Sequence, residues 1–211
     1  LKGFGDWIEQ LVAESTGKTC NGLIPVVGEN LSDPDVYGND RIFVGIAISG
    51  ETNSETDAAL EKLAAAGHPV VRFLLESPYD LGAECFRWEF ATAVAGAVMG
   101  IHPFNQPDVE GTKLITRKMV ERYGAGRSVA TQPPVMKHAY DSGEVGLHAP
   151  GVYGRGLVRL LPDESTMTDA LRAHLSQVRT GDYVALLVYL EWCEPYRRIV
   201  EKLRQDIRAS T

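Results

Sequence analysis

Two continuous apolar runs with a helical segment between them constrain the fold of this chain more than any other feature. The first run is RIFVGIAI (41–48), the helical segment is SETDAALEKLAAAG (54–67), and the second run is HPVVRFLL (68–75). Continuous β-branched runs are typical of strands that are buried on both faces, as in parallel sheets. The helical segment begins with Ser/Thr and ends at glycine, which favours a helix. The pattern predicts a βαβ unit and an α/β fold.

The remaining elements follow the same pattern. Further strands are predicted at GLIPVVG (22–28) and YVALLVYL (183–190). A first helix is predicted from the helical spacing of Trp7, Ile8, Leu11 and Val12, and further helices at 82–100, 108–123, 162–182 and 194–211. We expect the first helix to close at Gly17 with a left-handed residue. Residues 124–161 are rich in Gly, Pro, Ser and His and predict an irregular connection or a small subdomain.

The two ends of the chain suggest a piece of a longer polypeptide. The sequence starts without Met, and its last predicted strand and helix have no closing strand after them. We therefore expect the α/β fold to be truncated at its C-terminus.

Composition excludes several classes of function. The net charge of -7, without a run of Lys or Arg, argues against nucleic-acid binding, and no apolar run reaches the roughly 20 residues of a membrane span. Three distant cysteines favour a reducing, cytoplasmic compartment over a disulfide framework or a thiolate zinc site. The five histidines show no metal-ligand spacing.

The segment around Gly-Lys-Thr (17–19) is not a phosphate-binding P-loop. That motif needs an earlier glycine, where Val12 stands, and it precedes a helix, whereas here the helix comes first. The simplest interpretation is a helix end that carries a solvated Glu14.

Three stretches nevertheless resemble one family. EQLVAESTGK (9–18) resembles the Q-L-x-x-E-S-x-G-K segment of glucose-6-phosphate isomerases, and PFNQPDVEGTK (103–113) resembles their F-[DN]-Q-x-x-V-E-x-x-K signature. The stretch 87–110 is similar to the isomerase part of bacterial fusions with transaldolase. The resemblance covers 4–27 and 84–113 well, the strand near 183–190 more loosely, and 124–161 least.

The resemblance implies a fold and an activity. The fold is a three-layer α/β/α sandwich with a mainly parallel sheet, the second sugar-isomerase (SIS) domain of its parent. Residues 1–123 would form this domain, 124–161 a connection, and 162–211 the start of a following α/β segment. The parent would interconvert glucose 6-phosphate and fructose 6-phosphate without metal or organic cofactor. Its partners would be an N-terminal SIS domain, a transaldolase domain and, as is usual in this family, a second subunit.

The chemistry needs a carboxylate that moves a proton between adjacent carbons, and cationic or hydrogen-bonding groups that stabilise the enediolate. By resemblance, Glu14 is the base, Lys113 handles the ring oxygen or hydroxyls, and Gln106 contacts the substrate. Ser15 and Lys18, in the same motif as Glu14, are candidate substrate-binding residues. Without the motifs, Lys113 would be read as a surface lysine and Gln106 as a loop residue.

The sequence also departs from the family. Glu84 stands where the common isomerases place a histidine, so either it takes over proton transfer, or ring opening is served differently, or it is a first-turn glutamate favoured by the helix dipole. The family's phosphate-binding loops and supporting arginine belong to the N-terminal domain, and the stretch ISGETNSET (48–56) is better explained as a helix cap.

We therefore expect the isolated chain to have little or no activity. The alternative function is a non-catalytic module that binds sugar phosphates, because a fold of this kind does not fix function.

Overall fold

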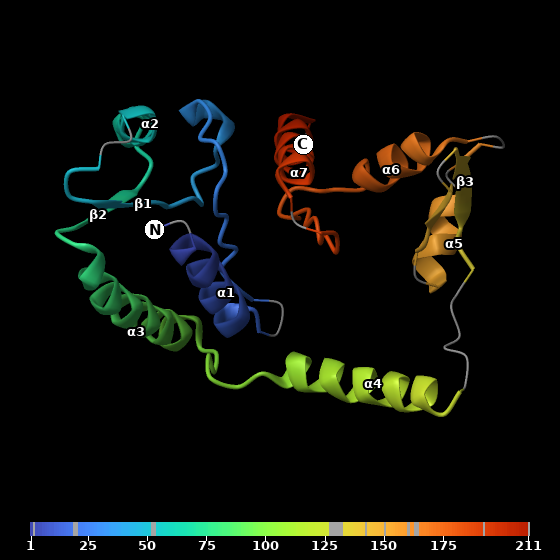
Figure 1. Cartoon of the computed structure of the whole chain (residues 1–211). Coiled ribbons are helices and arrows are strands. Elements are labelled where there is room, and N and C mark those ends of the chain that lie inside the picture. Colours follow the sequence, from blue (N-terminus) through green and yellow to red (C-terminus); the bar gives the residue numbers. More distant parts are fainter. Residues whose placement is uncertain are drawn as a thin grey trace. The chain divides into compact units, whose positions relative to one another are not determined.

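The computed structural model describes residues 1, 3–18, 21–51, 54–126, 133–141, 143–149, 151–159, 161–162, 165–191 and 193–210. The chain divides into two compact units, Leu1–Arg117 and Lys118–Thr211. Figure 1 labels most of their helices and strands. No helix among the described residues has the length and apolar character that a membrane crossing requires.

The predicted βαβ unit is confirmed in the first unit. Strand β1 (Phe43–Ile48), helix α2 (Ser54–Ala65) and strand β2 (Val70–Leu75) follow one another, and the strands pair in parallel from Phe43 opposite Val70 to Ile48 opposite Leu75. Leu60 and Leu63 of α2 are buried, as expected for a helix that contacts both strands. The continuous apolar runs therefore build a small parallel sheet with a helix packed against it.

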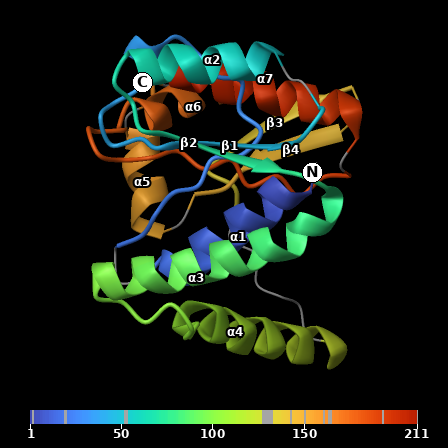
Figure 2. The same cartoon turned by 90° about the vertical axis from the view of Figure 1, so that its left-hand side faces the viewer.

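Helices α1 (Phe4–Thr16) and α3 (Leu81–Met99) lie side by side and run in the same direction (Figures 1 and 2). Phe4, Ile8 and Val12 recur every fourth residue, so they share one face of α1, and this face is buried. Cys85 and Trp88 of α3 pack against this cluster. The core of the unit thus fixes α1, and with it the last turn of α1, against α3.

A tight turn leads from α3 into α4 (Pro107–Gly124). Gly96 of α3 is buried, and a Cβ built on it would lie 2.7 Å from Cγ of Pro103, so only glycine lets the turn pack against the helix this closely. Pro107 opens α4, where a missing N–H costs nothing. The first part of α4 belongs to the first unit and the rest to the second.

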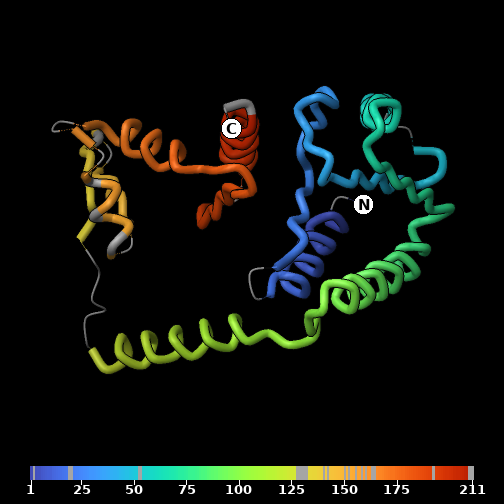
Figure 3. Tube along the Cα trace, turned by 180° about the vertical axis from the view of Figure 1, so that it is seen from behind, coloured from blue at the N-terminus to red at the C-terminus, as the bar shows by residue number. Residues whose placement is uncertain are grey.

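The segment that joins α1 to β1 (21–42) contains the short helix η1 (Pro34–Val36) and can be followed in Figure 3. His68 Nε2 lies 3.0 Å from the carbonyl oxygen of Pro34, and the ring of Tyr37 meets the ring of Phe43 edge to face at 5.0 Å. These contacts hold the segment against the beginning of the sheet. A second short helix, η2 (Pro78–Asp80), precedes α3.

The second unit contains elements that the sequence did not predict. Strands β3 (Met136–Tyr140) and β4 (Gly143–Leu147) form an antiparallel pair, and α5 (Gly151–Arg159) follows them. The stretch 124–161, expected to be irregular or a small subdomain, therefore carries a hairpin and a helix. Helices α6 (Met167–Leu175) and α7 (Glu194–Ser210) agree with the predicted helices, and Thr166 and Asp169 form a capping box at the start of α6.

Two predicted strands are not strands in the structure. Residues 22–27 and 182–189 have no regular secondary structure. In the second segment Val184, Leu186 and Val188 are partly buried while their neighbours are exposed, so the alternation of an extended chain is present without a hydrogen-bonded partner. The described residues therefore show a mixed α/β chain with a small parallel sheet.

Candidate active site

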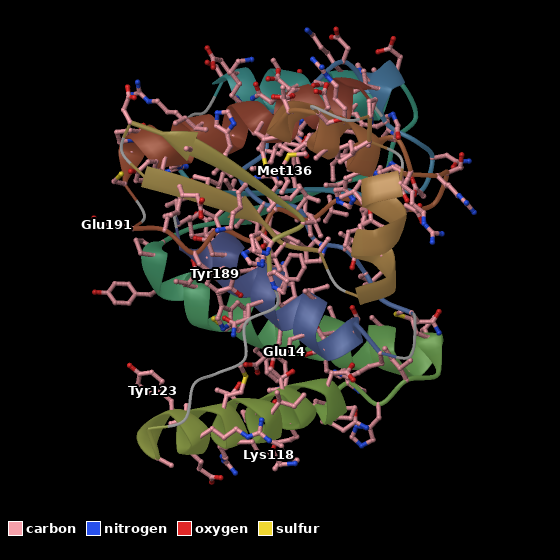
Figure 4. All side chains as sticks on the ribbon, turned by 90° about the vertical axis from the view of Figure 1, so that its right-hand side faces the viewer. Glu14, Lys118, Tyr123, Met136, Tyr189 and Glu191 are labelled. Atoms are coloured by element: carbon pink, nitrogen blue, oxygen red, sulfur yellow. The ribbon has the colours of Figure 1, made fainter. Side chains whose placement is uncertain are left out.

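Glu14 lies in the last turn of α1, where it is partly buried (Figure 4). Among the described residues, its carboxylate accepts no hydrogen bond and forms no ion pair, although its charge acts on Lys113. A carboxylate that is held on a helix and is not engaged by protein donors can accept a proton from a ligand.

The end of α1 is closed differently from the prediction. Gly17 caps the helix with φ -68°, which is not left-handed, and its N–H donates to the carbonyl oxygen of Ala13 at 2.9 Å. A Cβ at Gly17 would lie 2.8 Å from that oxygen, so the glycine is explained by close approach and not by a positive φ. The predicted stop at Gly17 is confirmed, and the predicted left-handed closure is wrong.

Lys113 lies on α4 and forms an ion pair with Glu110, with Nζ 2.9 Å from Oε1. This hydrogen bond, together with the charge of Glu110, raises the pKa of the Lys113 ammonium, and the charge of Glu14 adds to the effect. Glu14 is the smallest of the causes that raise this pKa, so the two motif residues interact through their charges.

A surface depression of about 450 Å³ runs along the same face of α4. Its volume lies within the range of about 300 to 1,000 Å³ that is usual for small-molecule sites. It is lined by residues at helical spacing: Asp108, Val109, Thr112, Lys113, Thr116 and Arg117. All of these come from one helix, so the depression is an open surface and not an enclosed pocket.

The remaining motif residues occupy different surroundings. Gln106 is exposed just before α4, and its carbonyl oxygen accepts a hydrogen bond from the N–H of Glu110 at 3.0 Å. Ser15 is partly buried beside Glu14. Lys18 is only 8% exposed, and its ammonium donates to the carbonyl oxygen of Glu14. The loop 48–56 includes residues 52 and 53, which lie outside the described residues.

Glu84 is buried in the first turn of α3, with 5% of its surface exposed. Its Oε1 lies 3.1 Å from Nη1 of Arg87, whereas its Oε2 has no hydrogen-bond partner among the described residues. Because α1 and α3 run in the same direction, Glu84 at the start of α3 and Glu14 at the end of α1 lie toward opposite ends of the helix pair (Figure 2). Glu84 therefore does not lie at the same end of the helix pair as Glu14.

Two contributors to this region were not predicted from the sequence. Glu110 forms an ion pair with the Lys113 ammonium. Because Glu110 stands three residues before Lys113 on a predicted helix, the sequence alone could have predicted this pair. Thr16 is completely buried; its hydroxyl donates to the carbonyl oxygen of Val12 at 2.7 Å and accepts from the N–H of Leu23 at 2.9 Å. A threonine next to a helix end gives no comparable signal in the sequence.

Comparison with known proteins gives the family context. No family model matches the chain, and no solved structure matches it. Among curated proteins, it is 31% identical to a glucose-6-phosphate isomerase of Rubrobacter xylanophilus over 160 residues, which are 59% of this chain and 37% of that protein. It is 28% identical to the isomerase of Pediococcus pentosaceus (54% of this chain, 33% of that protein) and 25% identical to that of Methanocaldococcus jannaschii (58% and 38%).

The chain therefore spans little more than a third of the length of the relatives that it matches. Several such relatives carry the same name and agree with the family to which the two motifs point. The comparisons relate more than half of this chain to glucose-6-phosphate isomerases.

Proposed function

We propose that this chain is the part of a glucose-6-phosphate isomerase that carries the catalytic base. The observation that carries the proposal is that Glu14, whose carboxylate has no hydrogen-bond partner among the described residues, acts through its charge on the Lys113 cation. These side chains come from motifs almost 100 residues apart in the sequence. The similarity to named isomerases supports the same conclusion.

In the proposed reaction, Glu14 takes the proton from carbon 2 of open-chain glucose 6-phosphate. The C–H electrons form the carbon 1–carbon 2 double bond of an enediolate, and the carbonyl electrons move to the oxygen on carbon 1. The Lys113 ammonium supplies positive charge for this developing oxyanion and handles the sugar hydroxyls. The hydroxyl proton on carbon 2 passes to the oxyanion on carbon 1. Glu14 then returns its proton to carbon 1, where the electrons of the carbon 1–carbon 2 double bond accept it, and the electrons on the carbon 2 oxygen form the keto group of fructose 6-phosphate.

Gln106 and Ser15 are proposed to contact the substrate, since they belong to the same motifs. Glu84 remains a second candidate for proton transfer. Because Glu84 is buried and paired with Arg87, that role would require α3 to repack.

We propose that the 211-residue chain turns over little substrate by itself. The depression found among the described residues is lined by one helix. The phosphate loops and the supporting arginine of the family lie outside the matched motifs. An N-terminal SIS domain, and in the proposed fusion a transaldolase domain, would complete the polypeptide. The site would be completed across subunits of a homodimer.

The test is the interconversion of glucose 6-phosphate and fructose 6-phosphate by the natural polypeptide that contains this chain. Replacing Glu14 by Gln removes the base and keeps the shape, and we expect a loss of about 100- to 10,000-fold in kcat. Replacing Lys118 by Gln is the control, because Lys118 is an exposed lysine elsewhere on α4. Hexose-phosphate binding without turnover by the unaltered polypeptide would favour the non-catalytic binding module.

A further inference from the structure

Lys18 has an unusual environment for a lysine. It is 8% exposed, although lysine is almost never fully buried unless its charge is paired. Among the described residues, Lys18 forms no ion pair. Its Nζ donates one hydrogen bond, at 2.5 Å, to the main-chain carbonyl oxygen of Glu14. The buried cation is therefore directed at the backbone of the proposed base.

This hydrogen bond completes the closure of α1. The last four carbonyl groups of a helix have no N–H partner within the helix, and two of them are satisfied here by the residues that follow. The Gly17 N–H donates to Ala13, and the Lys18 ammonium donates to Glu14. Within the helix, the Thr16 hydroxyl adds a bond to the Val12 carbonyl oxygen. The ammonium also suits the negative end of the helix dipole.

Lys18 is itself held in place. Its N–H donates to the carbonyl oxygen of Asn21 at 2.9 Å, and the N–H of Asn21 donates back to the carbonyl oxygen of Lys18 at 2.8 Å. The Lys18 side chain thus links the backbone pair of Lys18 and Asn21 to the Glu14 carbonyl. This bond fixes the main chain of Glu14, from which its side chain projects.

We propose that Lys18 is a positioning residue for Glu14 and does not bind the substrate. This inference rests on the proposed function of Glu14 as the base. It replaces the substrate-binding role that the motif alone suggests for Lys18. Proton transfer depends steeply on the placement of the base, so a lysine that fixes the last turn affects the chemical step and not substrate affinity.

The experiment compares Lys18→Met, Lys18→Arg and Thr16→Val in the natural polypeptide, with kcat and KM measured where each variant is fully folded. Met keeps an unbranched stem without the donor, and we expect kcat to fall by about 10- to 100-fold with KM close to the unaltered value. Arg keeps a donor and should recover part of kcat. Thr16→Val weakens the same helix end at Val12 and Leu23, so it should lower Tm and leave kcat nearly unchanged.

Two kinetic results would overturn the inference. A raised KM with unchanged kcat in Lys18→Met would mean that Lys18 contacts the substrate. An equal fall of kcat in Thr16→Val would mean that Lys18 acts only through the stability of the helix end.

A second measurement does not depend on activity. Three-bond NMR couplings in the chain without substrate report the χ1 angle of Glu14. We expect couplings that correspond to one rotamer in the unaltered chain and averaged couplings in Lys18→Met. Couplings in Lys18→Met that equal those of the unaltered chain would refute the inference. If Glu14→Gln were as active as the unaltered polypeptide while Lys18→Met disordered Glu14, the proposed function would fail and the structural role of Lys18 would stand.

Discussion

Among the individual side chains, carboxylates on α1 and α4 both influence the pKa of Lys113. Glu110 holds the Lys113 ammonium directly, and Glu14 acts on it electrostatically. Exposed ion pairs contribute little to stability, and this one is exposed, so its effect on the free energy of unfolding is small and shows mainly at the pH where Lys113 loses its proton. A lysine kept protonated remains available as a cation beside the proposed base.

Replacing Glu110 by Gln should lower the pKa of Lys113 toward its ordinary value, because the hydrogen bond that the Lys113 ammonium donates to Glu110 is the largest cause of its rise. An NMR titration of the Lys113 side-chain carbons measures this. The raised native pKa adds stability that is fully present below the unfolded value of about 10.4 and is lost as pH rises through the native pKa. The unaltered chain should therefore lose stability more steeply than the variant above that pH. An unchanged Lys113 pKa in the variant would contradict the assignment.

Thr16 should contribute more to stability than its small size suggests. In Thr16→Val, the N–H of Leu23 loses its acceptor and the Val12 carbonyl loses one of its donors, so the loss of two hydrogen bonds should lower the free energy of unfolding by about 1 to 3 kcal/mol. Urea denaturation measures the difference. Thr112→Val is the matched control, because Thr112 makes the same type of bond to Asp108 but is exposed, and it should change stability by less than about 0.5 kcal/mol. Equal effects of the two changes would refute the assigned role of Thr16.

Among the helices and strands, the turn between α3 and α4 decides where the second motif lies. The close contact of Gly96 with Pro103 places the start of α4, which carries Gln106 and Lys113. The parallel packing of α1 on α3 places Glu14. The site therefore depends on two helix contacts, both anchored on α3.

Replacing Gly96 by Val should displace this turn, because even a Cβ would lie 2.7 Å from Pro103 Cγ. We expect a loss of stability of about 1 to 3 kcal/mol and a loss of isomerase activity. Gly82→Ala is the control on the same helix: its Cβ would meet nothing within 4 Å, so it should stabilise the chain by about 0.4 to 1 kcal/mol. Unaltered activity in Gly96→Val would show that the turn does not place the site.

For the chain as a whole, the sequence predicted what depends on local pattern. The βαβ unit, α1, α3 and α4 follow from continuous apolar runs, helical spacing and capping residues. The segments 22–27 and 182–189 carry strand-like composition, but a strand also needs a partner, and pairing is a long-range property. The strands β3 and β4 are short and contain two glycines and a single β-branched residue, so they give little signal in the sequence.

The same holds for the residues of the candidate site. Each motif could be identified from the sequence alone, whereas the effect of the Glu14 charge on Lys113 and the burial of Lys18 follow only from the folded structure.

The most direct test of the central claim measures the exchange of the proton that Glu14 is proposed to transfer. Fructose 6-phosphate is incubated in deuterium oxide with the natural polypeptide that contains this chain, and deuterium at carbon 1 is measured by NMR. If Glu14 is the base, deuterium enters carbon 1 with the unaltered polypeptide, and Glu14→Gln slows its entry by about 100-fold or more. Exchange at the unaltered rate in Glu14→Gln would contradict the account and move the base elsewhere, with Glu84 the next residue to replace.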